Sequence, residues 1–146
     1  MKQPHAYLQE LPSRQPTIRV TTMPTDTNYY GDIFGGWLLG QMDLGAGNVA
    51  IRLSEGRAVT RSIENAEFKR KVNVGDEISI YAKMEGIGQT SIRILVEAWR
   101  RDPKGDLAEP VANAVFIFVA VDDLGRPRKV VKTGVDLHYI LGGDRD

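Results

Sequence analysis

Apolar and polar residues alternate along most of the second half of the chain. Apolar side chains occupy every second position from residue 78 to 84 and again from residue 92 to 98. A period of two is typical of strands with one buried face, and the short segment between the two runs, which contains Gly86 and Gly88, predicts a β-hairpin. Residues 111–121 are almost wholly apolar, which predicts an interior strand buried on both faces.

The chain before this hairpin shows weaker strand signals and one long loop. β-Branched residues recur from Thr17 to Thr22 with an alternating pattern, which predicts a strand. Residues 23–31 are rich in turn-forming residues and predict a loop. Residues 58–68 have the composition of extended chain, but their pattern is irregular.

A nearly uncharged stretch between these segments predicts a long buried helix. The helix starts at Phe34 or Gly35 and runs to Leu53, with Gly56 as its terminator. It contains three glycines, which are Gly40, Gly45 and Gly47. Glycine lowers helix propensity, so its presence is explained if a sheet must approach the helix backbone closely. The alternative is a weak or broken helix.

The order of these elements predicts an α+β fold in which a curved antiparallel β-sheet wraps a long central helix. An apolar helix of this length must be covered on most of its surface, and a strongly curved sheet can cover it. Helices and strands do not alternate, which argues against a doubly wound parallel sheet. We expect a single domain over residues 1–146, with residues 1–15 as a flexible arm and residues 131–146 as an unassigned tail.

Composition excludes several kinds of chemistry. The chain has 19 Lys and Arg against 19 Asp and Glu, so net charge gives no reason to expect a nucleic-acid or anionic-membrane partner. It has no cysteine, and its two histidines, His5 and His138, lie near the two ends. A Ser-His-Asp triad, a metal site or a cysteine nucleophile is therefore not expected. The N-terminus lacks the apolar core of a signal peptide, which predicts a cytoplasmic protein.

Asp43 is the one carboxylate in the middle of the predicted helix. Helical spacing places it on a face of small and apolar residues, including Gly36 and Ala46. Aspartate is a poor helix former and is rarely buried without a partner, so the position of Asp43 needs an explanation. The residue is either an active-site acid, or it reaches solvent or pairs with an arginine from a neighbouring strand.

Gly35 and Gly36 precede this face at the start of the helix. The first N–H groups of a helix have no intrahelical partner, and they can stabilise an oxyanion that approaches closely past glycine. Asn28, a few residues upstream, offers an amide that can donate a hydrogen bond or orient a water. The alternatives are a sharp loop-to-helix corner for the glycines and an ordinary turn asparagine for Asn28.

A third group of candidates is basic or hydroxylic. Lys69, Arg70 and Lys71 are consecutive, and Thr90 and Ser91 lie at the hairpin. Such residues can hold the phosphates of a nucleotide-containing ligand. Basic residues at a strand end are also used as a solvated edge that discourages pairing with other strands.

Taken together, these residues resemble the signature of hotdog-fold acyl-CoA thioesterases, most closely the YciA-type bacterial enzymes related to the cytosolic acyl-CoA hydrolases of animals. The matching segments are 26–28, 31–37 and 41–43, and further matches extend the likeness over about residues 17–130. This chain departs from the family in having Lys71 where a proline is common, and in the bulky pair Tyr29-Tyr30.

The resemblance implies a hotdog fold, a homodimer and often a trimer of dimers, with acyl-CoA as substrate and no cofactor besides the coenzyme A that the substrate carries. It implies that Asp43 is the catalytic carboxylate, acting as general base or as nucleophile. It also implies that Asn28 assists from the facing subunit and that the backbone of Gly35 and Gly36 forms the oxyanion hole. The resemblance further implies contacts to the substrate, chiefly to its coenzyme A part, from Thr60, Lys69, Arg70, Thr90 and Ser91.

Two rival functions remain at the level of sequence. A non-catalytic acyl-CoA-binding or sensing domain can share the same fold, although the presence of Asp43 and Asn28 argues against it. A hotdog dehydratase relies on a catalytic histidine, and neither His5 nor His138 is placed for that role.

Overall fold

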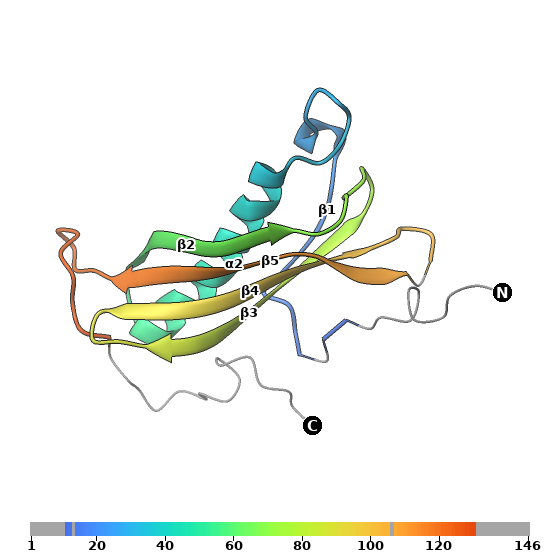
Figure 1. Ribbon diagram of the computed structural model, residues 1–146. Helices are drawn as coiled ribbons and strands as arrows, with labels where there is room; N and C mark the ends of the chain where they lie inside the picture. The colour runs from blue at the N-terminus through green and yellow to red at the C-terminus, as the bar shows by residue number, and fades with distance from the viewer. Residues whose placement is uncertain (1–10, 13, 106, 131–146) are drawn as a thin grey trace.

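The computed structural model describes residues 11–12, 14–105 and 107–130, which form one sheet and one long helix (Figure 1). The strands are β1 (Ile18–Thr21), β2 (Ala58–Phe68), β3 (Glu77–Ile87), β4 (Ser91–Arg101) and β5 (Ala108–Ala120), the long helix is α2 (Gly35–Ser54), and a short 3₁₀ turn, η1, spans Pro24–Asp26. The strand order is β1-β3-β4-β5-β2, and every neighbouring pair is antiparallel. This architecture confirms the predicted α+β class.

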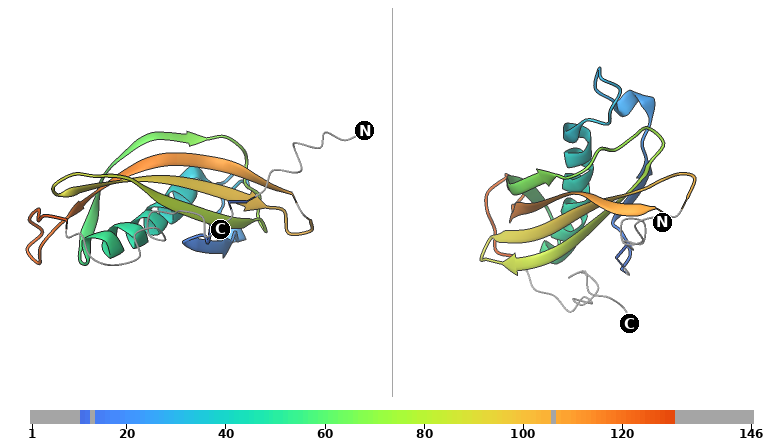
Figure 2. Two further views of the ribbon diagram at one scale, coloured as in Figure 1. Left: turned by 90° about the horizontal axis from the view of Figure 1, so that it is seen from below. Right: turned by 45° about the vertical axis from the view of Figure 1, so that its right-hand side comes forward.

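The sheet arches over α2, which lies along its concave side (Figure 2). The alternating residues of the predicted hairpin supply the sheet side of this core, as expected from their period. The fully buried side chains include Met42 and Ala46 of α2 together with Ile78, Ile80, Ile92, Ile94, Val96 and Phe116. Register places Ile94 opposite Phe116, so β4 and β5 present adjacent apolar side chains to the helix.

The opposite face of β3 is also covered, which alternation alone did not predict. Tyr81 and Ser79 occupy the polar positions of the pattern, yet both are buried. The guanidinium of Arg14 lies 5.3 Å from the centre of the Tyr81 ring, and the same arginine pairs with Glu97. Burial raises the pKa of the Tyr81 phenol. The end of the predicted N-terminal arm is therefore packed on the sheet at Arg14, whereas residues 1–10 lie outside the described chain.

Gly45 is the helix glycine that the sheet approaches most closely. A Cβ atom on Gly45 would lie 2.6 Å from the Thr17 hydroxyl oxygen and 2.7 Å from a methyl carbon of Ile80. Those distances are too short for any real Cβ contact, so only glycine fits there. The predicted reason for small residues in the helix is thus confirmed at Gly45. This reason does not apply to Gly40, where an added Cβ atom would meet nothing within 4 Å.

The helix ends at Ser54, and its C-cap is Glu55, one residue before the predicted terminator Gly56. Glu55, with a left-handed φ of 52°, terminates α2, so the prediction that Gly56 does so is wrong. Gly56 has a different role, because a Cβ there would lie 2.7 Å from the guanidinium of Arg128. That guanidinium donates to the backbone carbonyls of Ser54, Arg57 and Val121. Arg128 therefore holds the C-terminal end of the helix against the end of β5.

β2 is an edge strand, and its irregular sequence pattern has a structural cause. Its pairing with β5 shifts register twice, between Thr60 and Ser62 and again between Glu64 and Glu67. Asn65 adopts a φ of 54° at the second shift. Each shift changes which side chains face the helix, so no period of two can persist.

Within the described residues, no helix is long and apolar enough to cross a membrane.

The close approach at Gly45 predicts opposite effects for two glycine substitutions in one helix. Gly45→Ala is expected to lower the free energy of unfolding by about 1–3 kcal/mol, because the added methyl overpacks the contact with Thr17 and Ile80. Gly47→Ala is the matched control, because its Cβ would lie 3.7 Å from the Phe118 ring, an ordinary contact. It should raise stability by about 0.5–1 kcal/mol through helix propensity. Urea denaturation at one fixed protein concentration measures the free energy of unfolding of both variants. Equal changes in that free energy would contradict the packing argument.

Candidate active site

The carboxylate of Asp43 lies where the middle of α2 meets the edge strand β2. The Thr60 hydroxyl donates a hydrogen bond of 2.5 Å to Oδ1 of Asp43. No arginine pairs with Asp43 among the described residues, and its second oxygen, Oδ2, accepts no hydrogen bond from them. The aspartate is partly exposed. The structure therefore presents a carboxylate with one oxygen held and the other open, and the pairing with an arginine that the sequence left open is not observed.

Gly35 and Gly36 form the first turn of α2, and their N–H groups have no acceptor within the described chain. Phe34 is the N-cap and offers no side-chain cap. Two aromatic rings flank the glycines: a Cβ on Gly35 would lie 3.3 Å from the Phe68 ring, and one on Gly36 would lie 3.0 Å from the Phe34 ring. Glycine thus leaves room for these two rings. Nothing in the local sequence indicated the contact with Phe68, which is 33 positions away from Gly35.

Asn28 closes a tight turn and keeps its amide nitrogen available. Its side-chain oxygen accepts hydrogen bonds from the backbone N–H of Tyr30, at 2.9 Å, and of Asp32, at 3.1 Å. Because both donors are N–H groups, the atom that they meet must be Oδ1, and Nδ2 is left as a hydrogen-bond donor. Asn28 is therefore a turn asparagine, and its partly buried amide also keeps a donor without a partner in the described chain. An ion pair of 2.9 Å between Lys71 and Asp32 ties this turn to the chain after β2.

The three consecutive basic residues have three different surroundings. Arg70 pairs with Glu109 at 3.2 Å and donates to the Pro110 carbonyl at 2.9 Å. Lys71 pairs with Asp32, as described above. The Lys69 side chain has no partner among the described residues, and its N–H donates to the carbonyl of Val111. Of the three, only Lys69 leaves its side-chain charge uncompensated.

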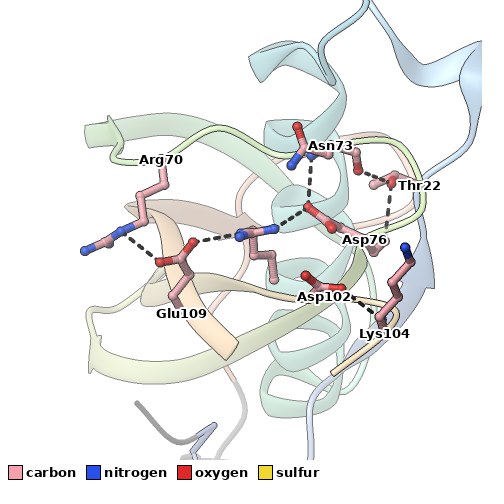
Figure 3. Close-up of polar contacts among 8 residues, drawn as sticks. Thr22, Arg70, Asn73, Asp76, Asp102, Lys104 and Glu109 are labelled. Carbon is pink, nitrogen blue, oxygen red and sulfur yellow. Dashed lines mark hydrogen bonds and ion pairs between the residues drawn. The ribbon is translucent and has the colours of Figure 1, made fainter. Parts of the chain in front are cut away.

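Glu109 links Arg70 to a buried ionic cluster at one end of the sheet (Figure 3). Its second oxygen pairs with Arg100 at 2.8 Å, and Arg100 pairs in turn with the buried Asp76 at 2.9 Å. Asp76 also accepts the N–H of Asn73, and the Thr22 hydroxyl donates to the carbonyls of both Asn73 and Asp76. The cluster joins the ends of β1, β3, β4 and β5, so Arg70 extends a structural network.

A separate cleft of about 620 Å³ opens beside the β3–β4 hairpin. Arg61 and Ser91 line it, together with Arg93. Arg93 pairs with Glu85 at 2.7 Å and with Glu64 at 3.0 Å, and these hydrogen bonds raise the pKa of its guanidinium. Arg61 has no such carboxylate partner in the described chain. Neither Thr90 nor the Asp43–Thr60 pair lines this cleft.

The helix N-terminus and Asp43 are separated by about two turns of α2. Gly36 precedes Asp43 by seven positions, which corresponds to about 10 Å along an α-helix. An oxyanion donor must lie about 3 Å from the oxygen that it stabilises, and a base must lie within hydrogen-bond reach of the attacking water. Asp43 and the helix N-terminus are therefore two candidate half-sites at separate places on α2.

The surface beside Asp43 is apolar and uncovered in the single chain. Exposed large hydrophobic residues on α2 and β2 include Leu44, Ile51, Val59, Ile63 and Phe68. β2 pairs with β5 on one side only, so its other edge presents free backbone groups. An apolar face next to an unpaired strand is typical of a surface that another chain covers.

Comparison with known proteins gives one consistent family. The family model described as the thioesterase superfamily matches residues 30–106. The acyl-CoA thioester hydrolase YciA of Salmonella typhimurium is 42% identical over 129 residues, which are 84% of this chain and 95% of that protein. A hexameric thioesterase from Yersinia pestis has a TM-score of 0.79 at 41% identity and covers 84% of this chain and 100% of its own. A hexameric hotdog fold thioesterase of Campylobacter jejuni has a TM-score of 0.76 at 37% identity, covering 88% and 96%. The hotdog fold implied by the sequence is confirmed.

The surroundings of the basic residues predict different effects for two neighbouring substitutions. Arg70→Ala is expected to lower the free energy of unfolding by about 1 kcal/mol, because it removes a partly exposed ion pair and a hydrogen bond to a carbonyl. Lys69→Ala, the control, should change it by less than about 0.5 kcal/mol. Chemical denaturation of both variants measures the difference, and an equal loss in Lys69→Ala would show that the contacts of Arg70 are not what stabilises this end of the sheet.

Proposed function

The chain belongs to the thioesterase superfamily, and from that membership we propose that it hydrolyses acyl-CoA thioesters to a free carboxylic acid and coenzyme A. The likeness to an acyl-CoA thioester hydrolase over most of both chains supports this substrate class. The reaction needs a water oxygen to attack the thioester carbonyl, an acceptor for its proton and a group to stabilise the oxyanion. Within the described residues, Asp43, Asn28 and the amides of Gly35 and Gly36 are the groups suited to these roles.

The observation that carries the mechanism is the asymmetric environment of Asp43. Thr60 holds Oδ1, so Oδ2 is free to take a proton from water. Water then adds to the carbonyl, the tetrahedral intermediate collapses, and the carbon–sulfur bond breaks to release coenzyme A, which takes up the proton. We assign Thr60 to positioning the carboxylate. Direct attack by Asp43, giving a mixed anhydride that water later hydrolyses, is the alternative route.

The two half-sites support an active site shared between two copies of the chain. The free amides at Gly35 and Gly36 and the Nδ2 donor of Asn28 would come from one copy, and Asp43 with Thr60 from the other. The spacing of about 10 Å along α2 favours this arrangement over a site within one chain. The uncovered apolar surface and the open edge of β2 supply the contact area for a homodimer, and a trimer of such dimers would match the hexameric relatives.

Coenzyme A would be held by its phosphates on the unpaired cations. Lys69 and Arg61 are two such cations, and Ser91 adds a hydroxyl in the cleft with Arg61. Arg70 is held by Glu109, so we infer that it supports the position of Lys69, and Thr90 supports Ser91 from the adjacent position. No other cofactor is proposed. The predicted cytoplasmic location is where such a substrate would be met.

Replacing Asp43 tests the central assignment. Asp43→Ala is expected to lower kcat by about 10²- to 10⁴-fold, because the proton acceptor is lost. Thr60→Val should lower kcat by a smaller factor, because the carboxylate remains but is less well oriented. The measurement is thiol release from a series of acyl-CoAs of increasing chain length. Saturable binding by the wild type without turnover would favour a non-catalytic binding domain instead, and full activity in Asp43→Ala would remove this mechanism.

Mixing two inactive variants tests whether the site is shared. Asn28→Ala and Asp43→Ala each destroy both sites of a homodimer, but a mixed dimer keeps one site with both native residues. Random pairing at equal amounts should therefore restore about a quarter of the wild-type activity in the unfractionated mixture and about half of it in an isolated mixed dimer, as two-fold symmetry requires. The two variants are co-expressed with different tags, and the doubly tagged species is isolated and assayed. A mixed dimer as inactive as its parents would mean that Asn28 and Asp43 act within one chain.

A further inference from the structure

Two large aromatic side chains stand exposed at the tip of the Asn28 turn. Tyr29 is 91% exposed and Tyr30 is 74% exposed. Their ring centres are 4.5 Å apart with an angle of 31° between the planes, and the two hydroxyl oxygens are 3.3 Å apart. Exposing two adjacent rings is unfavourable in water, so the pair marks a surface that something apolar covers.

The turn holds both rings outward. The N–H groups of Tyr30 and Asp32 bind the Asn28 side chain, and the N–H of Gly31 donates to the Asn28 carbonyl at 3.0 Å. Gly31 has a φ of 90°, a conformation that other residues rarely adopt. These contacts fix the backbone that carries the rings, so the pair is prepared for a ligand before binding.

The same turn presents the amide of Asn28, which places the rings beside the reaction centre. The Cα atoms of Tyr29 and Tyr30 lie within about 4 and 8 Å of that of Asn28, from the spacing of the chain. A carbonyl bound by Nδ2 carries the acyl chain on one side and the sulfur of coenzyme A on the other. The rings can therefore reach the groups next to the carbonyl and not the distant phosphates.

We propose that Tyr29 and Tyr30 form a binding surface for the acyl group, and that they make the enzyme prefer large apolar or aromatic acyl groups to short ones. The inference rests on the proposed function and names the part of the substrate that sets its specificity. The surface is uncharged, because phenols are neutral near pH 7, and the hydrogen bond to Tyr29 raises the pKa of Tyr30 further. The unpaired cations suited to the phosphates, Lys69 and Arg61, belong to other segments.

The test uses S-alkyl-CoA thioethers, which bind but cannot be hydrolysed, with ethyl, octyl and benzyl groups. Calorimetric titration gives the affinity of each for the wild type and for the double variant Tyr29→Ala/Tyr30→Ala. We expect the Kd of the octyl and benzyl compounds to rise by about 10-fold or more, because apolar contact is lost. The Kd of the ethyl compound should change less than about two-fold. Tyr29→Phe/Tyr30→Phe, which keeps both rings, should resemble the wild type.

The other outcomes separate this inference from the proposed function. Equal weakening for all three thioethers and for free coenzyme A would overturn the proposal in favour of a coenzyme A contact. A change in oligomeric size with no change in binding would show that the rings pack on the partner subunit. If the octyl preference depends on the tyrosines but the wild type hydrolyses no acyl-CoA, the result supports the binding surface and contradicts the proposed hydrolase function. If the wild type binds no thioether, both fall.

Discussion

The packing of α2 against the concave side of the sheet is the constraint on which the rest of the structure depends. At Gly45 the helix backbone touches Thr17 and Ile80, and no side chain fits between them. A sheet that comes this close must curve around the helix, and its edge strand β2 follows the curve by shifting register twice. Thr60 stands at the first of these shifts and donates its hydrogen bond to Asp43, so the site lies where the helix meets the irregular edge strand.

The same packing leaves part of the helix surface uncovered. α2 has one side on the sheet, while Leu44 and Ile51 lie on the side that the single chain does not cover. Asp43 is partly exposed between these two environments. A group at such a boundary is accessible to substrate, while the helix and β2 still fix its position. The first turn of the helix, with its free amides, is accessible in the same way and lies about 10 Å along the axis from Asp43.

Patterns of residues near one another in sequence were enough to predict the fold. Alternation identified β3 and β4, the apolar run identified β5, and the uncharged stretch identified α2 to within a residue or two. Contacts between distant positions were not predictable in this way. Arg128 at the helix end, Glu109 beside Arg70 and Phe68 beside Gly35 depend on which side chains the folded sheet brings together. The burial of Tyr81 was missed for the same reason, because alternation says nothing about what covers the second face of a strand.

The open edge of β2 also matters before assembly. A newly synthesised chain that has folded but not met its partner exposes an extended strand with free N–H and C=O groups, bordered by apolar side chains. Such an edge accepts any other strand, including one from a misfolded chain. In the proposed homodimer, the unassembled chain would therefore be the aggregation-prone species. The association of two copies would compete with that loss, so the yield of folded protein would depend on the local concentration of newly made chains.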